Sequence, residues 1–207
     1  MNYLSSSTII DYDHPAINEL FHELNTDSTD ATFLKNVYRF ARDVIEFEFC
    51  DFGDTIGDTV MKKKGHCYHK TNLITGLCRK KGIQAGIKLC TIQSDVLKPY
   101  LTDEVLDIFS GQPVSHFFSV ILIEGKWVSV DSIFDKDLLR YSDRLHWAMA
   151  QEWSGFSSIE LPRDLILNEH NEIFVKAFED GDLPPANPLL DQMNEKLRVI
   201  RNELNRK

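Results

Sequence analysis

The sequence predicts a domain of the α+β class, with helices in its first part and antiparallel strands after them. Two amphipathic segments before residue 50 have helical spacing, and an unbroken helical segment begins at Cys67. Beyond residue 110, two β-rich runs are joined by a two-residue turn. Helices and strands that are separated along the chain in this way are typical of the α+β class.

Length and composition bound the organisation of the chain. Its 207 residues correspond to one domain, and 43% hydrophobic and 27% charged residues are typical of a soluble globular protein. We expect a single domain over residues 1–182. A proline-rich linker and an amphipathic helix are expected to follow it over residues 183–207.

The charge and the hydrophobic pattern disfavour several classes of partner. The 23 basic and 32 acidic residues give a net charge of −9, and nucleic-acid binding rests largely on lysine and arginine. No apolar run approaches the ~20 residues that span a bilayer, and the first residues lack the pattern of a secretory signal. Four cysteines without paired spacing fit reduced thiols. We expect a cytoplasmic protein that binds neither nucleic acid nor a membrane.

Two helices are predicted near the start of the chain. The first begins at Pro15, which suits a first helical turn, and the second covers residues 33–45 with Asp30 as its candidate cap. In both segments, apolar side chains recur at helical spacing. Glycines at positions 53, 57 and 65 then bracket a predicted loop.

A third helix is predicted from Cys67 to Lys80. It ends where two lysines precede Gly82, since cations and a glycine favour the end of a helix. A strand over residues 83–89 follows with alternating apolar positions, and then a short helix over residues 102–109.

A β-hairpin is predicted from residues 116–123 and 126–131, with a turn at Glu124 and Gly125. In this register His116 and Asp131 are diagonal neighbours on one face, with Cα atoms ~7–8 Å apart, a gap that a side-chain hydrogen bond can close. The pair could equally be a polar network at the end of the hairpin.

The C-terminal segment carries a narrow apolar seam from Leu190 to Leu204. Such a helix can dock on its own domain or form a homodimer, and a seam of little more than two heptads favours docking. Residues 142–153 also have a helical pattern, whereas the stretch 132–182 gives no functional signal.

Cys67 is the leading candidate for a nucleophile. A cysteine in the first turn of a helix faces unpaired N–H groups and the positive end of the helix dipole, which favour the thiolate. The backbone N–H of Cys67 can also serve as an oxyanion donor. Cys50, Cys78 and Cys90 lack this placement, and we expect them to be structural.

Cys67, His116 and Asp131 can divide the work of acyl transfer. A thiolate attacks an acyl carbon, an imidazole carries the proton, and a carboxylate orients the imidazole. A compact cluster of His66, Cys67 and His69 could suggest zinc, but no second pair of ligands completes four. We expect neither a metal nor a cofactor.

The residues around these positions resemble the transglutaminase-like superfamily, which has a papain-like cysteine–histidine–aspartate core. The family pattern is Gly-x-Cys, a leucine-rich helix ending in Arg-x-x-Gly-Ile, a histidine on a strand, and Trp-x-x-x-Asp. It matches in order and spacing at residues 65–67, 79–83, 116 and 127–131. The resemblance covers about residues 34–135 and is strongest with small prokaryotic members.

The resemblance implies that Cys67 is the nucleophile, His116 its base and Asp131 the partner that orients the histidine. It also implies an α+β fold in which N-terminal helices and the cysteine-bearing helix pack on an antiparallel sheet. Neither calcium nor cross-linking is assumed, because the chain lacks room for the β-sandwich domains of the calcium-dependent cross-linking enzymes.

Three further residues are candidates for contact with a substrate. His66 and Tyr68 flank Cys67, and Trp127 shares the predicted face of His116 and Asp131.

The expected function is cysteine-dependent acyl transfer, above all hydrolysis of an amide bond in a peptide or protein. Water as the acceptor gives a protease, amidase or deamidase, whereas an amine as the acceptor gives a transglutaminase; the sequence does not choose between them. The alternative from another class is a non-catalytic binding or scaffold domain that uses the same cleft.

Overall fold

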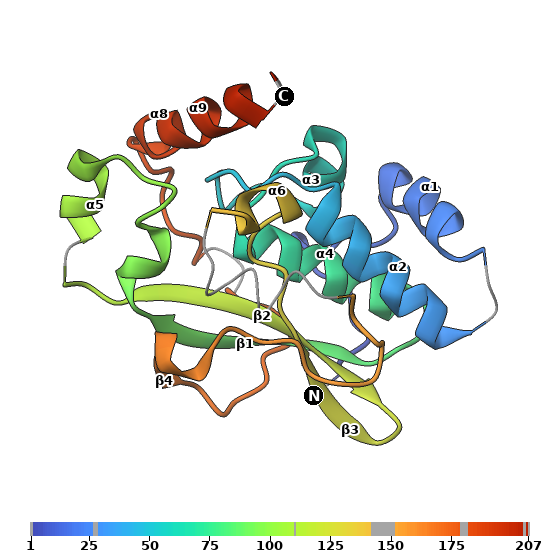
Figure 1. Ribbon diagram of the computed structural model, residues 1–207. Coiled ribbons are helices and arrows are strands. Elements are labelled where there is room, and N and C mark those ends of the chain that lie inside the picture. Colours follow the sequence, from blue (N-terminus) through green and yellow to red (C-terminus); the bar gives the residue numbers. More distant parts are fainter. Residues whose placement is uncertain are drawn as a thin grey trace.

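The computed structural model describes residues 2–26, 29–109, 111–141, 152–178, 182–204 and 206. Its centre is a four-stranded antiparallel sheet, with most of the helices gathered on one side (Figure 1). The strands lie in the order β3-β2-β1-β4, with β1 at Ala85–Ile92, β2 at Val114–Ile123, β3 at Lys126–Val130 and β4 at Ile166–Glu169. The predicted α+β class is confirmed.

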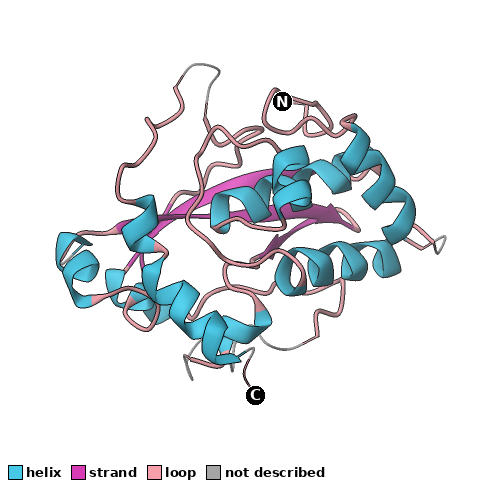
Figure 2. Cartoon of the chain, turned by 90° about the horizontal axis from the view of Figure 1, so that it is seen from above, coloured by secondary structure: helices cyan, strands magenta, loops and turns pink. Residues whose placement is uncertain are grey.

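Helices precede, interrupt and follow the strands, and seen from above they lie over the sheet (Figure 2). They are α1 (Pro15–Leu24), α2 (Asp30–Asp43), α3 (Ile56–Lys62), α4 (Cys67–Lys80), α5 (Asp103–Phe109), α6 (Lys136–Leu139), α8 (Leu190–Met193) and α9 (Glu195–Leu204), with the 3₁₀ helices η1 (Ser94–Leu97) and η2 (Arg163–Leu165).

Two predictions for the N-terminal part need correction. The cap of α2 is Thr29, whose side chain accepts a hydrogen bond from the backbone of Thr32, so Asp30 is the first helical residue. The predicted loop after residue 53 contains α3, which a capping box of Thr55 and Asp58 starts. Gly57 is needed for close approach, since a Cβ there would lie 2.5 Å from Nδ1 of His14.

Helix α4 is buried between the other helices and the sheet. Its small polar side chains tie it to β2, because the Thr71 hydroxyl donates to the carbonyl of Phe117 at 3.1 Å. In return, the Ser119 hydroxyl donates to the carbonyl of Thr71 at 3.1 Å. These reciprocal bonds set the position of the α4 N-terminus relative to β2.

The hairpin has the predicted turn and register. Glu124 and Gly125 have φ of 51° and 79°, the left-handed conformation of a two-residue turn whose twist matches the strands. Pairing runs from Ile123 opposite Lys126 to Ser119 opposite Val130. The other strand predictions shift: β1 begins two residues later than expected, and β2 begins at Val114.

The buried side chains form two hydrophobic clusters. One lies between α1, α2, α4 and the sheet and includes Leu73 and Ile121. The other joins the ends of β1 and β2 to η1, α6 and α9 and includes Tyr100 and Phe134. Cys67 packs against both clusters, so the N-terminus of α4 lies where they meet.

The C-terminal seam docks on the same chain, as the length argument favoured. Met193, Leu197 and Ile200 are buried in the second cluster. The predicted single helix is interrupted at Asn194, whose side chain exchanges two hydrogen bonds, both 2.9 Å, with the backbone of Phe49. The helix predicted over 142–153 falls mostly outside the described residues, and its last two residues are not helical.

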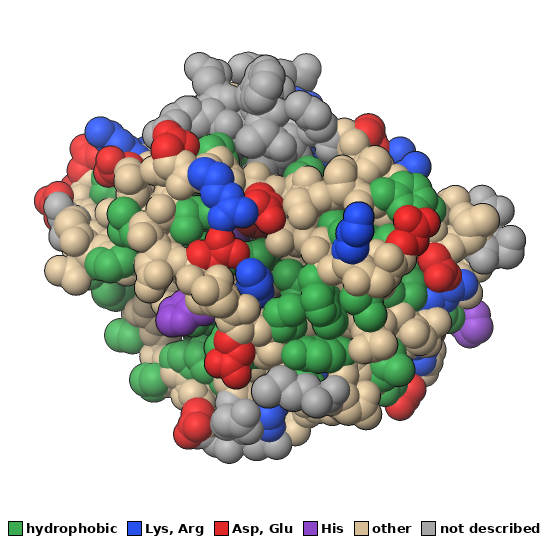
Figure 3. Space-filling view, turned by 90° about the horizontal axis from the view of Figure 1, so that it is seen from below, with side chains coloured by type: hydrophobic (Ala, Val, Ile, Leu, Met, Phe, Trp, Pro, Cys, Tyr) green, Lys and Arg blue, Asp and Glu red, His purple; other side chains and the backbone are tan. Residues whose placement is uncertain are grey.

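The face seen from below has basic and acidic side chains close together among hydrophobic ones (Figure 3). In the part of the chain that the structure describes, no helix is both long and apolar enough to cross a membrane.

Arg79, near the end of α4, holds three distant segments together. Its buried guanidinium donates hydrogen bonds to the backbone carbonyls of Ser5, Ala85 and Val175 at distances from 2.6 to 3.0 Å. Removing it leaves several carbonyls without this donor. We expect Arg79→Ala to lower the free energy of unfolding by about 3 kcal/mol, measured by urea denaturation.

The control is Arg198→Ala, which removes an ion pair between Arg198 and Asp191 on the exposed surface. Exposed pairs contribute little, so this variant should stay within about 0.5 kcal/mol of the wild type. Equal stabilities of the two variants would contradict the structural role of Arg79.

Candidate active site

Cys67 is the first residue of α4 and is half-buried. The residue before it, His66, makes no side-chain capping hydrogen bond to the helix. The amides of the first turn therefore lack the partner that a capping side chain supplies at other helices. Together with the helix dipole, they favour a negative charge on the sulfur or on an oxygen bound beside it.

His116 and Asp131 form a buried pair at the far end of the hairpin from its turn. The Nε2–H of His116 donates to Oδ2 of Asp131 at 2.6 Å, and the two residues are only 1% and 2% exposed. The sequence predicted this juxtaposition from the register, and the structure confirms it. A short hydrogen bond to an ionised group in a low dielectric is strong and fixes the orientation of the ring.

The backbone around Asp131 keeps its carboxylate in place. Oδ1 accepts a hydrogen bond from the backbone N–H of Ile133 at 3.0 Å, which leaves Oδ2 for the histidine. The backbone N–H of Asp131 donates to the carbonyl of Ile159 at 3.0 Å, and Ile159 forms an isolated parallel bridge with Val130 of β3. Both carboxylate oxygens therefore have protein partners.

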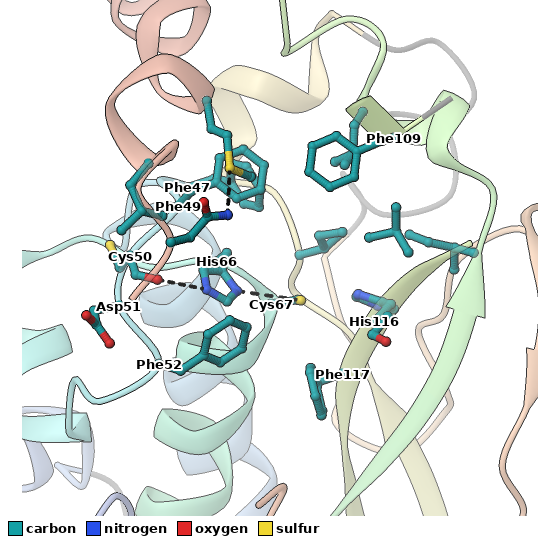
Figure 4. A pocket seen from close by; sticks show the side chains of 18 of the residues that line it. Phe47, Phe49, Cys50, Asp51, Phe52, His66, Cys67, Phe109, His116 and Phe117 are labelled. Atoms are coloured by element: carbon teal, nitrogen blue, oxygen red, sulfur yellow. Dashed lines mark hydrogen bonds between the residues drawn. The ribbon is translucent and has the colours of Figure 1, made fainter. Parts of the chain in front are cut away.

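The second ring nitrogen of His116, Nδ1, is buried and has no hydrogen-bond partner among the described residues. Figure 4 places the ring beside the sulfur of Cys67. Burial lowers the pKa of His116, but the Asp131 carboxylate and Cys67 raise it by more than burial lowers it, and the resulting pKa is about 10. The imidazole therefore favours its protonated form at neutral pH, with a proton on the side of the thiol.

His66 lies on the other side of the sulfur. Its Nε2–H donates to the carbonyl of Cys50 at 3.3 Å, so Nδ1 is left as an acceptor 3.9 Å from Sγ of Cys67. Burial, together with the neighbouring His69, lowers the pKa of His66 well below its usual value. Cys67 thus lies between a neutral histidine and a protonated one.

The ring nitrogens of His66 and His69 do not point with Cys67 toward a common metal position. Nε2 of His66 and Nε2 of His69 each face a backbone carbonyl, the latter that of Asp51 at 2.9 Å. Within the described ranges, no group of three His, Cys, Asp or Glu side chains is placed to hold a metal ion.

A cavity of about 250 Å³ opens beside Cys67 and His116 (Figure 4). Its walls come from the loop after α2, the start of α4, the ends of β1 and β2, helix α5 and the C-terminal segment. Five phenylalanines line it: Phe47, Phe49, Phe52, Phe109 and Phe117. The arrangement presents a thiol and an imidazole to an apolar cavity.

Of the three residues predicted to contact a substrate, only His66 lines this cavity. Tyr68 turns into the core, where its ring packs against Phe52 and Phe117, because adjacent helical residues point in different directions. Trp127 pairs with Leu122 near the hairpin turn, six residues along β2 from His116 or roughly 20 Å, and its ring packs on Tyr3. Tyr68 and Trp127 therefore lie outside this cavity.

Sequence reasoning missed two walls of the cavity. One is the aromatic segment Phe47–Phe52, whose closely spaced phenylalanines were a visible but unused signal. The other is the C-terminal segment, in which Pro185, Leu190 and Met193 reach the cavity. Its separation in sequence from Cys67 left no local signal.

The other cysteines differ from Cys67 in their chemistry. Burial raises the pKa of Cys50, Cys78 and Cys90 to about 12, so all three stay as thiols at neutral pH. Cys78 belongs to the core of α4, and Cys90 lies on β1 opposite His116. Of the four cysteines, Cys67 alone lies at a helix N-terminus with His66 on one side and His116 on the other.

Comparison with known proteins places the chain in a family. The family model of the transglutaminase-like superfamily matches residues 18–132, more than half of the chain, and the match ends just past Asp131. The chain therefore belongs to the transglutaminase-like superfamily. The match begins within α1, earlier than the residues that carry the resemblance in the sequence.

Among solved structures, the chain is similar to a protein from Cytophaga hutchinsonii whose proposed activity is that of a cysteine protease. The two are 16% identical with a TM-score of 0.48, and the similarity covers 63% of this chain. It spans 40% of the length of that protein. No curated protein matches the chain.

The charge of His116 should depend on Asp131. In the wild type, a pKa raised to about 10 keeps the ring protonated from acid pH through neutral pH. In Asp131→Asn the carboxylate is lost while burial remains, so we expect the pKa to fall by at least about 2 units and the neutral ring to form at lower pH. NMR titration of ¹⁵N-labelled histidine side chains between pH 5 and 10 measures this shift.

The resonance of His116 is identified by its loss in His116→Gln. Asp137→Asn, which removes a partly exposed carboxylate from α6, should leave the titration unchanged. A His116 resonance with the same midpoint in the wild type and Asp131→Asn would contradict the coupling.

Proposed function

We propose that this chain is a cysteine-dependent acyl-transfer enzyme that hydrolyses an amide bond in a peptide or protein. In this proposal Cys67 is the nucleophile, His116 the general acid and base, and Asp131 the group that orients the histidine. Membership of a family of cysteine enzymes supports the proposal. The observation that carries it is the buried 2.6 Å pair of His116 and Asp131 beside the sulfur at the start of α4.

Acylation would begin with attack of the Cys67 thiolate on the carbonyl carbon of the amide. The backbone N–H of Cys67 would donate to the oxygen as negative charge develops there. Protonated His116 would then give its Nδ1 proton to the leaving nitrogen, because an amine leaves readily only when protonated. The products of this half are a thioester on Cys67, a free amine and neutral His116.

Deacylation would reverse the role of the histidine. Neutral His116 would take a proton from a water molecule that attacks the thioester carbon, and collapse of the intermediate would release the carboxylic acid and the Cys67 thiolate. The protonated ring is then restored. Asp131 stays hydrogen-bonded to Nε2 of the ring and favours the imidazolium that each half-reaction uses or forms.

Two alternatives differ in what they require of the site. A true transglutaminase would use the same thioester and an amine in place of water. A non-catalytic binding or scaffold domain would use the cleft without an activated thiol, and the charged His116–Asp131 pair beside a half-buried cysteine disfavours it.

Selective alkylation tests the activated thiol. At pH 6 we expect iodoacetamide to label Cys67 at least ~10-fold faster than Cys50, Cys78 or Cys90, because burial raises the pKa of those three to about 12. His116→Ala should lower the rate at Cys67 and so reduce the preference, because the thiolate loses its neighbouring imidazolium, whereas His170→Ala, which changes an exposed histidine, should keep it. Mass spectrometry of the labelled peptides gives the four rates. Uniform slow labelling of all four cysteines would favour the binding-domain alternative.

The acceptor can be identified with a peptide library and a competing amine. We expect the wild type to hydrolyse peptides of the library and Cys67→Ala to hydrolyse none. The control Cys78→Ser changes a cysteine remote from the cavity, and the folded protein of this variant should still hydrolyse them. Mass spectrometry with added hydroxylamine separates carboxylic acids from hydroxamates. Amide exchange that exceeds hydrolysis at low amine concentration would instead indicate a transglutaminase.

A further inference from the structure

Apolar side chains make up most of the wall of the cavity beside Cys67, and His66 and His116 of the site also line it. Its inner wall is formed by phenylalanines and aliphatic side chains from both hydrophobic clusters. Asp51 and Ser115, which also line it, are exposed residues, so they belong to the mouth. Among the described lining residues there is no lysine or arginine.

Two further polar side chains of the wall, those of Asn187 and Cys50, bring no charge into the cavity. Asn187 accepts a hydrogen bond from the backbone of Leu189 at 2.9 Å and donates to the sulfur of Met193 at 3.5 Å. Burial keeps the thiol of Cys50 neutral, since it raises its pKa to about 12. His116 also lines the cavity, but the Asp131 carboxylate already offsets its charge. A charged side chain that entered the interior would therefore lose its water without gaining an unpaired opposite charge there.

We propose that this cavity is the specificity pocket of the enzyme and that it takes a bulky uncharged apolar side chain, aromatic or branched aliphatic, next to the scissile amide of a peptide. This inference rests on the proposed function, because it takes Cys67 as the attacking group. The volume of about 250 Å³ lies just below the ~300–1,000 Å³ of small-molecule sites, which fits one large side chain.

The C-terminal segment supplies one wall of the pocket and is held firmly. Leu190 and Met193 line the cavity, and Asn194 anchors them through its two hydrogen bonds to the backbone of Phe49. Further along, the Lys196 ammonium donates to the carbonyl of Leu101 at 2.9 Å. The residues that close the pocket thus lie outside residues 18–132, which the family model matches. The choice of substrate side chain is therefore assigned in part to the C-terminal segment.

Alkylating peptides test the pocket through the rate at which they modify Cys67. A dipeptidyl chloromethyl ketone reacts when the thiolate forms a C–S bond and chloride leaves. Two positions, the residue that bears the ketone and the residue before it, are varied in turn among Phe, Leu, Gly, Asp and Lys. At one of the two positions we expect Phe and Leu to react about 100-fold faster than Asp and Lys, with Gly between them.

A charge placed in the wall should change this preference. In Leu190→Arg, the ratio of the Phe rate to the Asp rate should fall at least ~10-fold, because the new cation gives a carboxylate a partner. Val199→Arg adds the same charge on α9, where Val199 is 52% exposed, and should leave the ratio unchanged. A ratio of two rates cancels any change in the reactivity of the thiol itself.

The outcomes separate this inference from the proposed function. Preferential labelling of Cys67 by iodoacetamide with peptide rates that ignore the side chain at both positions would overturn the pocket and leave the function standing. A preference for Asp, Lys or Gly would overturn it as well. Absence of the iodoacetamide preference would overturn the proposed function. The wild-type panel alone decides the matter if Leu190→Arg fails to fold.

Discussion

The site depends on one buried hydrogen bond, the 2.6 Å contact between His116 and Asp131. Burial by itself would make the imidazole neutral, and the carboxylate reverses that effect so that the pKa of His116 rises to about 10. The bond also fixes which nitrogen is free, because Nε2 is held by Asp131 and Nδ1 remains on the side of Cys67. Protonation state and direction of the ring thus have a common cause.

The nucleophile is positioned by the packing of α4. Thr71 and Ser119 exchange hydrogen bonds with backbone carbonyls across the helix–sheet contact, which fixes the helix against the strand that carries His116. The helix begins where the two hydrophobic clusters meet, so its first turn is the point at which a sulfur can reach both the sheet and the apolar cavity. Packing brings together groups that lie far apart in sequence.

Contacts between residues on the two strands of the hairpin could be predicted from the sequence, because the turn sets their register. Contacts that depend on packing between distant segments could not. A two-residue turn at Glu124 and Gly125 fixes the register, and the register fixes the His116–Asp131 contact. Long-range packing has no such rule. The aromatic segment Phe47–Phe52 and the docked residues near Met193 lie far apart in sequence. Trp127 shares a face with His116 but lies at another position along the strand, which the pattern of faces does not reveal.

The C-terminal wall and the nucleophile helix are also linked through Asp135. This carboxylate accepts hydrogen bonds from the backbone of Phe47 and from Arg201 of α9, both at 2.7 Å, and its other oxygen caps α6. Burial raises the pKa of Asp135, but Lys70 and Arg201 lower it by more, so the net pKa is below its usual value and the carboxylate stays ionised. Lys70 lies one turn along α4 from Cys67, fully buried, with a pKa that burial lowers to about 8 in spite of Asp135. Asp135 is the main carboxylate partner of both Lys70 and Arg201, so a displacement of Arg201 on α9 changes the charge balance near the helix that carries Cys67.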